Sequence, residues 1–578
     1  MVLDAEPVQN GRSEDLSGEQ DFAIPLTLRD PLTSRVDRVK GRRVLQLAAT
    51  LGRKFDYELL LAVSSMDEEV LSRELRHLVA AELLYQKGTV LQEATFEFKH
   101  SLIRDAAYAL LTKAERETYH KRVGSLLEER FSEVAKAHPE IVAHHYTQAR
   151  SYEKALRYWY TAGEQSAARS AHSEAVGHLK QGLRQIPHVD DPLLRSKMEL
   201  QLQIALGNSL RATKGWSIEE VRHAYTRALQ LSRESESVEH VFTALFGLWS
   251  WNYVHAALGE AHALAEHLRD AVKNADNRMH RVLAQQAIGF TLFAYGKFDA
   301  AHAELERGLS MCDASEGRDF VDPSAQDPGV HMRCYDGMAL WFLGYPDRAL
   351  QVCADARRIS QVPWSEGLAR TITLRVHQLR GEPAAVAAQA NAAIALCEEH
   401  EIVHYLGMSL ILRGWANAQQ GEFDKGIAEM QDGLEKVRGT GNLITESYSL
   451  GLLAEACLKN ERYGQAFDFL EQAQIGLEEQ GSVRFYAAEI YRLLGEAYRR
   501  SQQDLDQAER WFSKGLKVAR EQKAKSLELR LCMSMCDLDE PKRSAERHRP
   551  QLNELFGSFS EGFATGDLVS AKARLKPV

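Results

Sequence analysis

Apolar residues recur every three or four positions over most of the chain, from about residue 116 onward. These stretches are about 12–18 residues long, and short segments containing Gly, Asn or Pro separate them. The spacing places the apolar side chains on one face of an α-helix, while the polar segments mark turns. The pattern therefore predicts an all-α architecture of successive antiparallel helix pairs.

The helical stretches also repeat, with a step of about 40 residues. Each copy has a turn, then a small residue early in the following helix, and another small residue seven positions later. The first small residues are Ala301, Ala349, Gly426, Ala466 and Ala508, the second are Gly308, Ala356, Gly433, Ala473 and Gly515, and a weaker copy is centred on Val386. Small residues on one face let a neighbouring helix pack closely, which is the tetratricopeptide scheme with longer helices. We expect a tetratricopeptide-like α-solenoid superhelix over residues 116–545, with earlier copies at 170–183 and 215–229.

The N-terminal part has a different pattern. Residues 1–21 are polar and without periodicity, which predicts a disordered lead-in. Residues 22–115 predict helices over 32–52, 56–64 and 67–84, with Asp67 as an N-cap, and then strands over 83–88 and 96–100. Three helices followed by a small β-wing are typical of a winged-helix domain. Residues 546–578 are expected to form a C-terminal helical tail.

Composition adds few constraints. Hydrophobic residues make up 44% and charged residues 26%, as in ordinary globular proteins. The formal net charge is −10 and no long basic run occurs, so a nucleic-acid partner is not expected. Seven cysteines without a C-x-x-C pair favour buried thiols in a reducing compartment. Without an apolar run of membrane-spanning length or a signal peptide at Met1, we expect a cytoplasmic protein with no membrane contact.

His100 is the first candidate site residue. It follows the strand pattern F-x-F and precedes an apolar-faced helix in "FEFKHSLIRDAAYALL" (96–111). At such a junction free backbone N–H groups converge, so a histidine there is well placed to meet a phosphate. The alternative is a helix-start histidine that packs against the wing without any ligand.

"HEIVH" (400–404) fits the zinc motif H-E-x-x-H, which needs both histidines on one continuous helix. Here one repeat helix ends and the next begins, so we expect His400 and His404 to straddle a turn. No third ligand is evident, and we predict no metal site. Adjacent His144 and His145 point about 100° apart on a helix and are expected to be solvated or to cap it.

Two further features have simple structural interpretations. Cys532 and Cys536 lie one helical turn apart and could share a metal or a disulfide, but we expect core thiols. The helix over 72–84 could read DNA through Arg73, Arg76 and His77. Glu74 and Glu82 oppose that positive charge, so DNA binding is not expected.

Tryptophans and tyrosines recur at helical spacing, as in "LWSWNYVHAAL". They predict either solenoid core or an aromatic-lined groove for a protein partner or small effector. Trp249, Trp251 and Tyr253 are the candidate groove residues.

Several phrases resemble bacterial STAND-type ATPases and the class III adenylate cyclases that share their C-terminal half. The resemblance runs from about residue 24 to the C-terminus, through 24–39, 44–55, 96–111, 162–183, 339–350, 413–423 and 560–575. It implies a winged helix and tetratricopeptide repeats that follow a P-loop ATPase module and, in some members, a cyclase domain. It also implies that His100 stands where the family's winged helix touches ADP.

The family's catalytic residues do not occur in this chain. No G-x-x-x-x-G-K-[ST] is present, and the one Gly-Lys pair, Gly296–Lys297, is followed by Phe298. The P-loop supplies the backbone cradle and the lysine for nucleotide phosphates. "AIGFTLF" (287–293) echoes a cyclase motif, but Gln286 stands in place of the metal-binding aspartate.

The chain is therefore expected to be non-catalytic and to have no cofactor of its own, with ATP or ADP only where another chain supplies an ATPase module. We expect a signalling scaffold whose solenoid binds a protein partner or effector and couples it to such an ATPase or cyclase module. Two alternatives stay open, a fragment of the enzyme itself and a winged-helix DNA-binding regulator.

Overall fold

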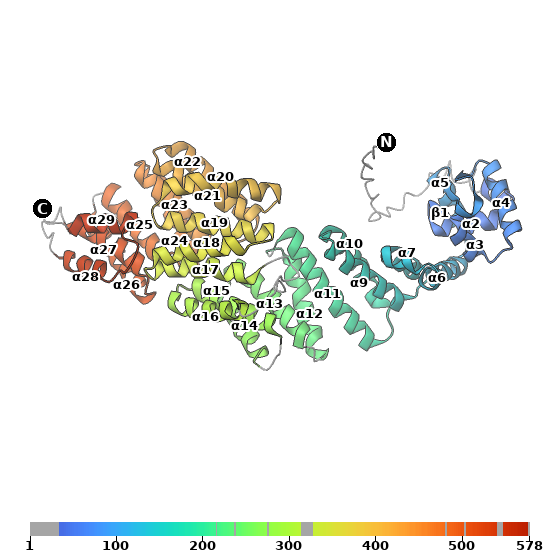
Figure 1. Ribbon diagram of the computed structural model, residues 1–578, viewed down its shortest axis with the longest axis horizontal. Helices are drawn as coiled ribbons and strands as arrows, with labels where there is room; N and C mark the ends of the chain where they lie inside the picture. Colours follow the sequence, from blue (N-terminus) through green and yellow to red (C-terminus); the bar gives the residue numbers. More distant parts are fainter. Residues whose placement is uncertain are drawn as a thin grey trace, which may run out of the picture. The chain divides into compact units, whose positions relative to one another are not determined.

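The computed structural model describes residues 34–215, 217–235, 238–273, 277–313, 327–479, 483–501, 504–539 and 547–575. The chain divides into two compact units, Met1–Leu206 (unit 1) and Gly207–Val578 (unit 2). Both are built almost wholly of helices, and one small sheet lies near the N-terminal end of the described residues (Figure 1). The expected lead-in over 1–21 lies outside the described residues.

Unit 1 begins with a three-stranded antiparallel sheet and the helices around it. The strands have the order β1-β3-β2, and Phe55 pairs with Phe96 while Leu84 pairs with Phe98. The elements are α2 (Arg42–Leu51), β1 (Lys54–Asp56), α3 (Tyr57–Ser64), α4 (Glu68–Ala80), β2 (Leu84–Lys87), η1 (Leu91–Glu93), β3 (Thr95–Phe98) and α5 (Ser101–Ala109). The three phenylalanines are almost fully buried and join the sheet to the helices.

The structure confirms most of the elements predicted here and corrects two. Asp67 caps α4 by accepting a hydrogen bond from the Glu69 N–H at 2.9 Å, and both predicted strands are present. The helix predicted over 32–52 is broken at Gly41, whose φ of 88° is left-handed backbone that favours glycine. The sequence prediction missed β1, because three residues are too few to show an alternating pattern. The winged-helix assignment stays a prediction.

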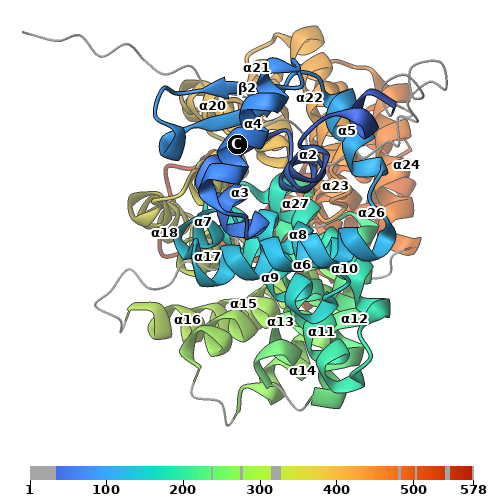
Figure 2. The ribbon, with the colours of Figure 1, turned by 90° about the vertical axis from the view of Figure 1, so that its right-hand side faces the viewer.

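The rest of unit 1 consists of helix pairs. They are α6 (Lys113–Glu129), α7 (Ser132–Ala137), α8 (Pro139–Gln148), α9 (Tyr152–Ala168), α10 (His172–Gln185) and η2 (Ile186–His188). Thr112 and Glu115 form a capping box that starts α6. Helix α6 contacts α2, α3 and α8, so it links the sheet region to the pairs, and Figure 2 shows α2 and α3 above it. Helix α11 (Pro192–Lys214) begins in unit 1 and ends in unit 2.

Unit 2 is an α-solenoid. Its helices are α12 (Glu219–Ser235), α13 (Val238–Val254), α14 (Leu258–Ala271), α15 (Arg278–Ala294), α16 (Phe298–Asp313), α17 (Pro328–Phe342), α18 (Pro346–Ile359), α19 (Pro363–Leu379), α20 (Pro383–Glu399), α21 (Val403–Gln419), α22 (Phe423–Gly439), α23 (Glu446–Lys459), α24 (Tyr463–Glu479), α25 (Ala487–Ser501), α26 (Leu505–Glu521), α27 (Lys525–Asp539), α28 (Arg549–Gly557) and α29 (Gly566–Leu575). From α13 to α26 each odd-numbered helix packs with the next even-numbered one, and odd-numbered helices contact one another to form a layer (Figure 1).

The small residues of the repeat lie where close packing needs them. All ten are buried, as is Val386. A Cβ atom on Gly426 would lie 2.4 Å from the Gly414 carbonyl oxygen, and one on Gly433 would lie 2.5 Å from that of Gly407. These backbones touch because neither helix carries a side chain there. The predicted solenoid packing is confirmed.

Successive turns of this superhelix contact each other. The Leu443 N–H donates to the Val254 carbonyl at 2.8 Å, and the Arg484 N–H donates to the Ala294 carbonyl at 2.8 Å. Further along, the Ser526 hydroxyl donates to the Trp341 carbonyl at 2.6 Å, across 185 residues of sequence. Two loops before later repeats and the first turn of α27 therefore form hydrogen bonds with the C-terminal ends of earlier odd-numbered helices.

Candidate functional site

His100 lies at the predicted junction. It is the N-cap residue of α5, with extended backbone, and its exposed side chain makes no capping hydrogen bond. Arg104 and Asp105 on the same helix pair with each other, with Arg104 Nε 2.9 Å from Asp105 Oδ1. The contact between His100 and a nucleotide stays a prediction.

The zinc motif is interrupted, as predicted. Helix α20 ends before His400, Glu401 has a left-handed φ of 53°, and α21 starts at Val403. The two histidines therefore do not share a helix face. Within the described ranges, no three His, Cys, Asp or Glu side chains are grouped so that they could hold a metal ion. None of the seven cysteines forms a disulfide within the described ranges, and Cys532 lies in the core.

One expectation about the adjacent histidines is wrong. His144 is exposed, but His145 is buried in unit 1 with its Nδ1 atom 2.8 Å from Nδ1 of His120. His120 also contacts the Tyr108 hydroxyl through Nε2 at 2.9 Å. Burial lowers the pKa of His120 to about 3 and holds the pKa of His145 well below its usual value. His145 belongs to a buried neutral cluster because α6 packs against α8, which no local pattern shows.

Helix α4 presents little free positive charge. Arg73, Arg76 and His77 are exposed, but Glu74 lies 3.6 Å from Arg73 and 3.9 Å from His77. This arrangement gives no support to DNA reading by α4, and the absence of a nucleic-acid partner stays a prediction.

The three candidate aromatic residues of α13 have different surroundings. Trp249 is 3% exposed and donates from Nε1 to the Thr291 hydroxyl at 3.0 Å, so it belongs to the core. Trp251 is half-buried and stacks on His255 with ring centroids 3.9 Å apart. Tyr253 is buried, and its hydroxyl donates to that of Tyr335 at 3.3 Å. Of the three, Tyr253 lines a cavity.

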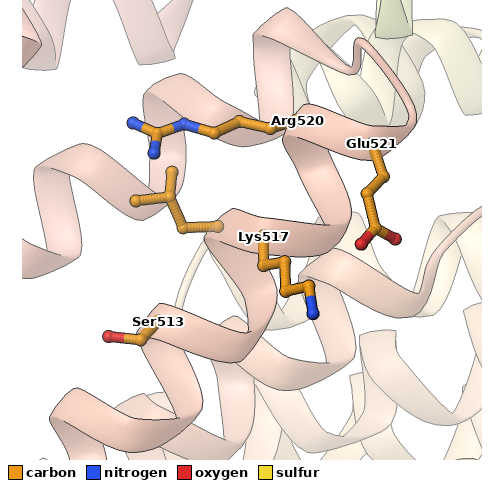
Figure 3. A pocket seen from close by; sticks show the side chains of 5 residues that line it. Ser513, Lys517, Arg520 and Glu521 are labelled. Carbon is orange, nitrogen blue, oxygen red and sulfur yellow. The ribbon is translucent and has the colours of Figure 1, made fainter.

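Besides the cavity at Tyr253, unit 2 has a hollow of about 570 Å³ on its surface. Its five lining residues, Ser513, Leu516, Lys517, Arg520 and Glu521, all belong to α26 (Figure 3). Four of them are exposed, and Arg520 pairs with Glu528 at 2.8 Å. A hollow along one helix, open to water, does not enclose a ligand.

The cavity at Tyr253 lies inside the superhelix and has a volume of about 50 Å³. Helices α13, α15, α17, α19 and α21 contribute to its wall, together with the segments that precede α23 and α25. Its lining residues are Tyr253, Phe293, Tyr335, Met338, Leu368, Thr371, Ile372, Arg375, His404, Tyr405, Met408, Asn442, Ile444, Thr445 and Phe485. Repeats far apart in sequence thus share one cavity.

Helical spacing explains how α19 lines the cavity. Leu368, Thr371, Ile372 and Arg375 lie three, four and seven positions apart, so they share one helix face. Three of these positions carry the apolar or small polar side chains expected of a solenoid interior. The fourth, Arg375, carries a full positive charge and is only 4% exposed.

Arg375 is surrounded by aromatic rings. Its guanidinium carbon lies 3.8 Å from the ring centroid of Tyr448 and 5.0 Å from that of Phe485. No described Asp or Glu forms an ion pair with it. Aromatic faces compensate a buried cation only in part, and a buried charge without a counter-charge is costly.

The neighbouring polar groups are neutral. Burial lowers the pKa of His404 to about 4, and the charge of Arg375 adds to this effect. Burial raises the pKa of the Tyr253 and Tyr335 hydroxyls, and the same arginine opposes that rise. Arg375 is thus within electrostatic reach of all three, and it supplies the one positive charge of the cavity wall at neutral pH.

Sequence reasoning missed Arg375. The available signal was "TITLRVHQL" (371–379), in which an arginine interrupts the interior face of a repeat helix between Leu374 and Val376. That signal does not reveal whether a carboxylate from a distant repeat meets the arginine.

The fold and the cavity define a tetratricopeptide-like α-solenoid with an internal cavity that contains one buried arginine. No family model matches the chain. The uncharacterized protein R02095 of Rhizobium meliloti (strain 1021) is 23% identical to it over 530 residues, which are 88% of this chain and 50% of that protein. The chain thus spans about half the length of this relative.

Several solved structures that resemble this chain are helical-repeat proteins, and their similarity to it is low. The APC/C hetero-tetramer Cut9–Hcn1 has a TM-score of 0.43 and 12% identity, covering 89% of this chain and 98% of its own. A Rap protein complexed with Competence and Sporulation Factor has a TM-score of 0.37 and 9% identity, covering 70% and 99%. These scores are too low to carry any inference about function. Among the described residues, no helix has the length and apolarity to cross a bilayer.

Proposed function

We propose that this chain is a non-catalytic regulatory scaffold whose solenoid binds a protein partner or small effector. One observation carries the proposal: a cavity to which five repeat helices and two inter-repeat segments contribute. An occupant there would contact successive turns of the superhelix at once, so binding would change how firmly the turns hold together. Such linkage between a site and a whole domain is what an effector-sensing scaffold requires.

In the same proposal, the scaffold acts on an adenylate cyclase or STAND ATPase module supplied by another chain. The resemblance of residues 24–575 to such proteins supports this part. His100 would then contact the nucleotide of that module, since its exposed side chain stands at the start of α5 and lacks a partner within the described part of the chain. ATP or ADP would be bound only in that assembly.

The test is affinity capture with the full chain as bait, followed by a nucleotide assay on the captured complex. We expect a cyclase or ATPase to be recovered, and its turnover to change when the scaffold is present. The isolated chain is expected to form no cyclic AMP and to hydrolyse no ATP. Turnover by the pure chain, or repeated capture without any cyclase or ATPase, would contradict the proposal.

A further inference from the structure

The buried Arg375 is unusual because no described Asp or Glu forms an ion pair with it. Elsewhere in unit 2 the buried guanidinium of Arg380 lies 2.9 Å from Asp347 and 2.8 Å from Glu382. At Arg380 two carboxylates therefore balance the charge of a buried arginine. Around Arg375 the chain provides aromatic rings and hydroxyl groups instead.

Those hydroxyl groups are hydrogen-bond donors that face the cavity. Thr445 is 9% exposed, and its hydroxyl oxygen has no hydrogen-bond partner among the described residues. Tyr405 makes no hydrogen bond within the described part of the chain. Tyr335 accepts from Tyr253, so its own proton is free to be donated. Donors that converge beside a buried cation favour an anion.

Charge and volume restrict which anion fits. His404 is neutral, so the cavity wall offers one positive charge, which matches one negative charge. A volume of about 50 Å³ accommodates about three or four water molecules, the size of a carboxylate with a short tail. Apolar Phe293, Leu368 and Ile372 complete the wall and suit an alkyl tail.

The cavity is in part open to solvent. Tyr335, His404, Tyr405 and Asn442 in its wall are half-buried, whereas Thr371, Arg375 and Thr445 are buried. The segment that carries Asn442 and Thr445 is tied to α13 by the hydrogen bond from Leu443 to Val254. An anion bound at Arg375 would therefore share a cavity wall with a segment that joins two turns of the superhelix.

We propose that this cavity binds a small monocarboxylate, with Arg375 as its counter-charge and Tyr335, Tyr405 and Thr445 as hydrogen-bond donors. The proposal rests on the proposed function, in that it names the chemical class of the effector. The binding itself needs no partner protein and can be measured on the full chain alone.

The experiment is calorimetric titration of the full chain with propionate, and with propionamide as the neutral isostere at equal ionic strength. Propionate is expected to bind saturably and propionamide not to bind. In Arg375→Met the affinity is expected to fall at least about thirtyfold, because the charge pair is lost. Arg520→Met, which removes an arginine from the open hollow on α26, is the matched control and should leave the affinity unchanged.

A second variant tests the proposal if Arg375→Met does not fold. Tyr405→Phe removes one donor and keeps the ring, and a severalfold weaker affinity is expected. The idea is overturned if propionate does not bind, if propionamide binds equally well, if inorganic phosphate binds more tightly than propionate, or if Arg375→Met binds propionate as the unaltered chain does. A missing cyclase or ATPase partner with propionate binding intact would overturn only the proposed function.

Discussion

Arg375 and Arg530 occupy similar places but have opposite surroundings. Both lie on odd-numbered helices of the solenoid, and both guanidinium groups stand over an aromatic ring, Tyr448 in one case and Trp341 at 5.0 Å in the other. Arg530 also meets Asp567 at 2.8 Å and Glu489 at 3.3 Å, and it donates to the Leu379 carbonyl at 2.7 Å. Arg375 meets no carboxylate within the described ranges. A charge that has counter-charges within the chain stabilises the fold, whereas a buried charge without them is costly, and a bound anion would reduce that cost.

The largest effect is expected from Arg530→Met. Removing this guanidinium takes a counter-charge from Glu489 and Asp567, so we expect a loss of about 3–5 kcal/mol in the free energy of unfolding. Urea unfolding of the full chain, followed by circular dichroism, measures it. Arg438→Met is the control, since Arg438 and Glu446 form an exposed pair expected to contribute less than about 1 kcal/mol. Equal losses in the two variants would remove the basis of the comparison.

The buried histidines of unit 1 extend the comparison to groups that stay neutral. The folded-state pKa of His120 is lowered from 6.5 to about 3, so only the unfolded chain takes up a proton between those values. Stability is therefore complete above pH 6.5 and falls as the pH drops toward 3, by about 2 kcal/mol at pH 5 for His120 alone. Thermal unfolding across this window measures the effect.

A control variant separates this cluster from other acid-sensitive groups. His145→Gln should flatten the pH dependence, because it removes one buried titratable group, while exposed His144→Gln should change it less. A pH dependence that is unaltered in His145→Gln would contradict the assignment.

Arg375→Met is expected to leave the unfolding free energy unchanged or to raise it by about 1 kcal/mol, in buffer without carboxylates. Loss of the contacts with Tyr448 and Phe485 is offset because a buried charge without a counter-charge disappears. The same urea titration applies. A loss as large as that of Arg530→Met would show that Arg375 is structural.

The smallest effect is expected at His100. Its side chain is exposed and makes no capping hydrogen bond, so His100→Ala should change the unfolding free energy of the isolated chain by no more than about 0.5 kcal/mol. The nucleotide turnover of a captured module should change instead. A marked loss of stability would favour a packing role for His100.

The repeats were predictable because close helix packing leaves a local signature. Gly426 and Gly433 are small since a carbonyl group of the partner helix touches each backbone, and their spacing of seven is visible in sequence. The interruption between His400 and His404 was predictable because one repeat helix ends there and the next begins. Local patterns therefore give the helix pairs and their turns.

The cavity was not predictable, because it depends on contacts between distant repeats. Tyr253 and Phe485 are both merely aromatic in sequence, and only the curvature of the superhelix brings them to one wall. That no described carboxylate forms an ion pair with Arg375 also depends on how the distant repeats pack together. Likewise the burial of His145 depends on a helix 25 residues earlier, and β1 on pairing with a strand about 40 residues away.

The bonds between successive turns change how unit 2 should unfold. In an open repeat array each unit touches only its neighbours, so the ends fray first and melting proceeds stepwise. Here the hydrogen bond from Ser526 to Trp341 makes early and late repeats mutually dependent. Removing the last helices would therefore loosen the middle of the chain, and the solenoid should melt cooperatively, as a closed ring of repeats rather than as a line of them.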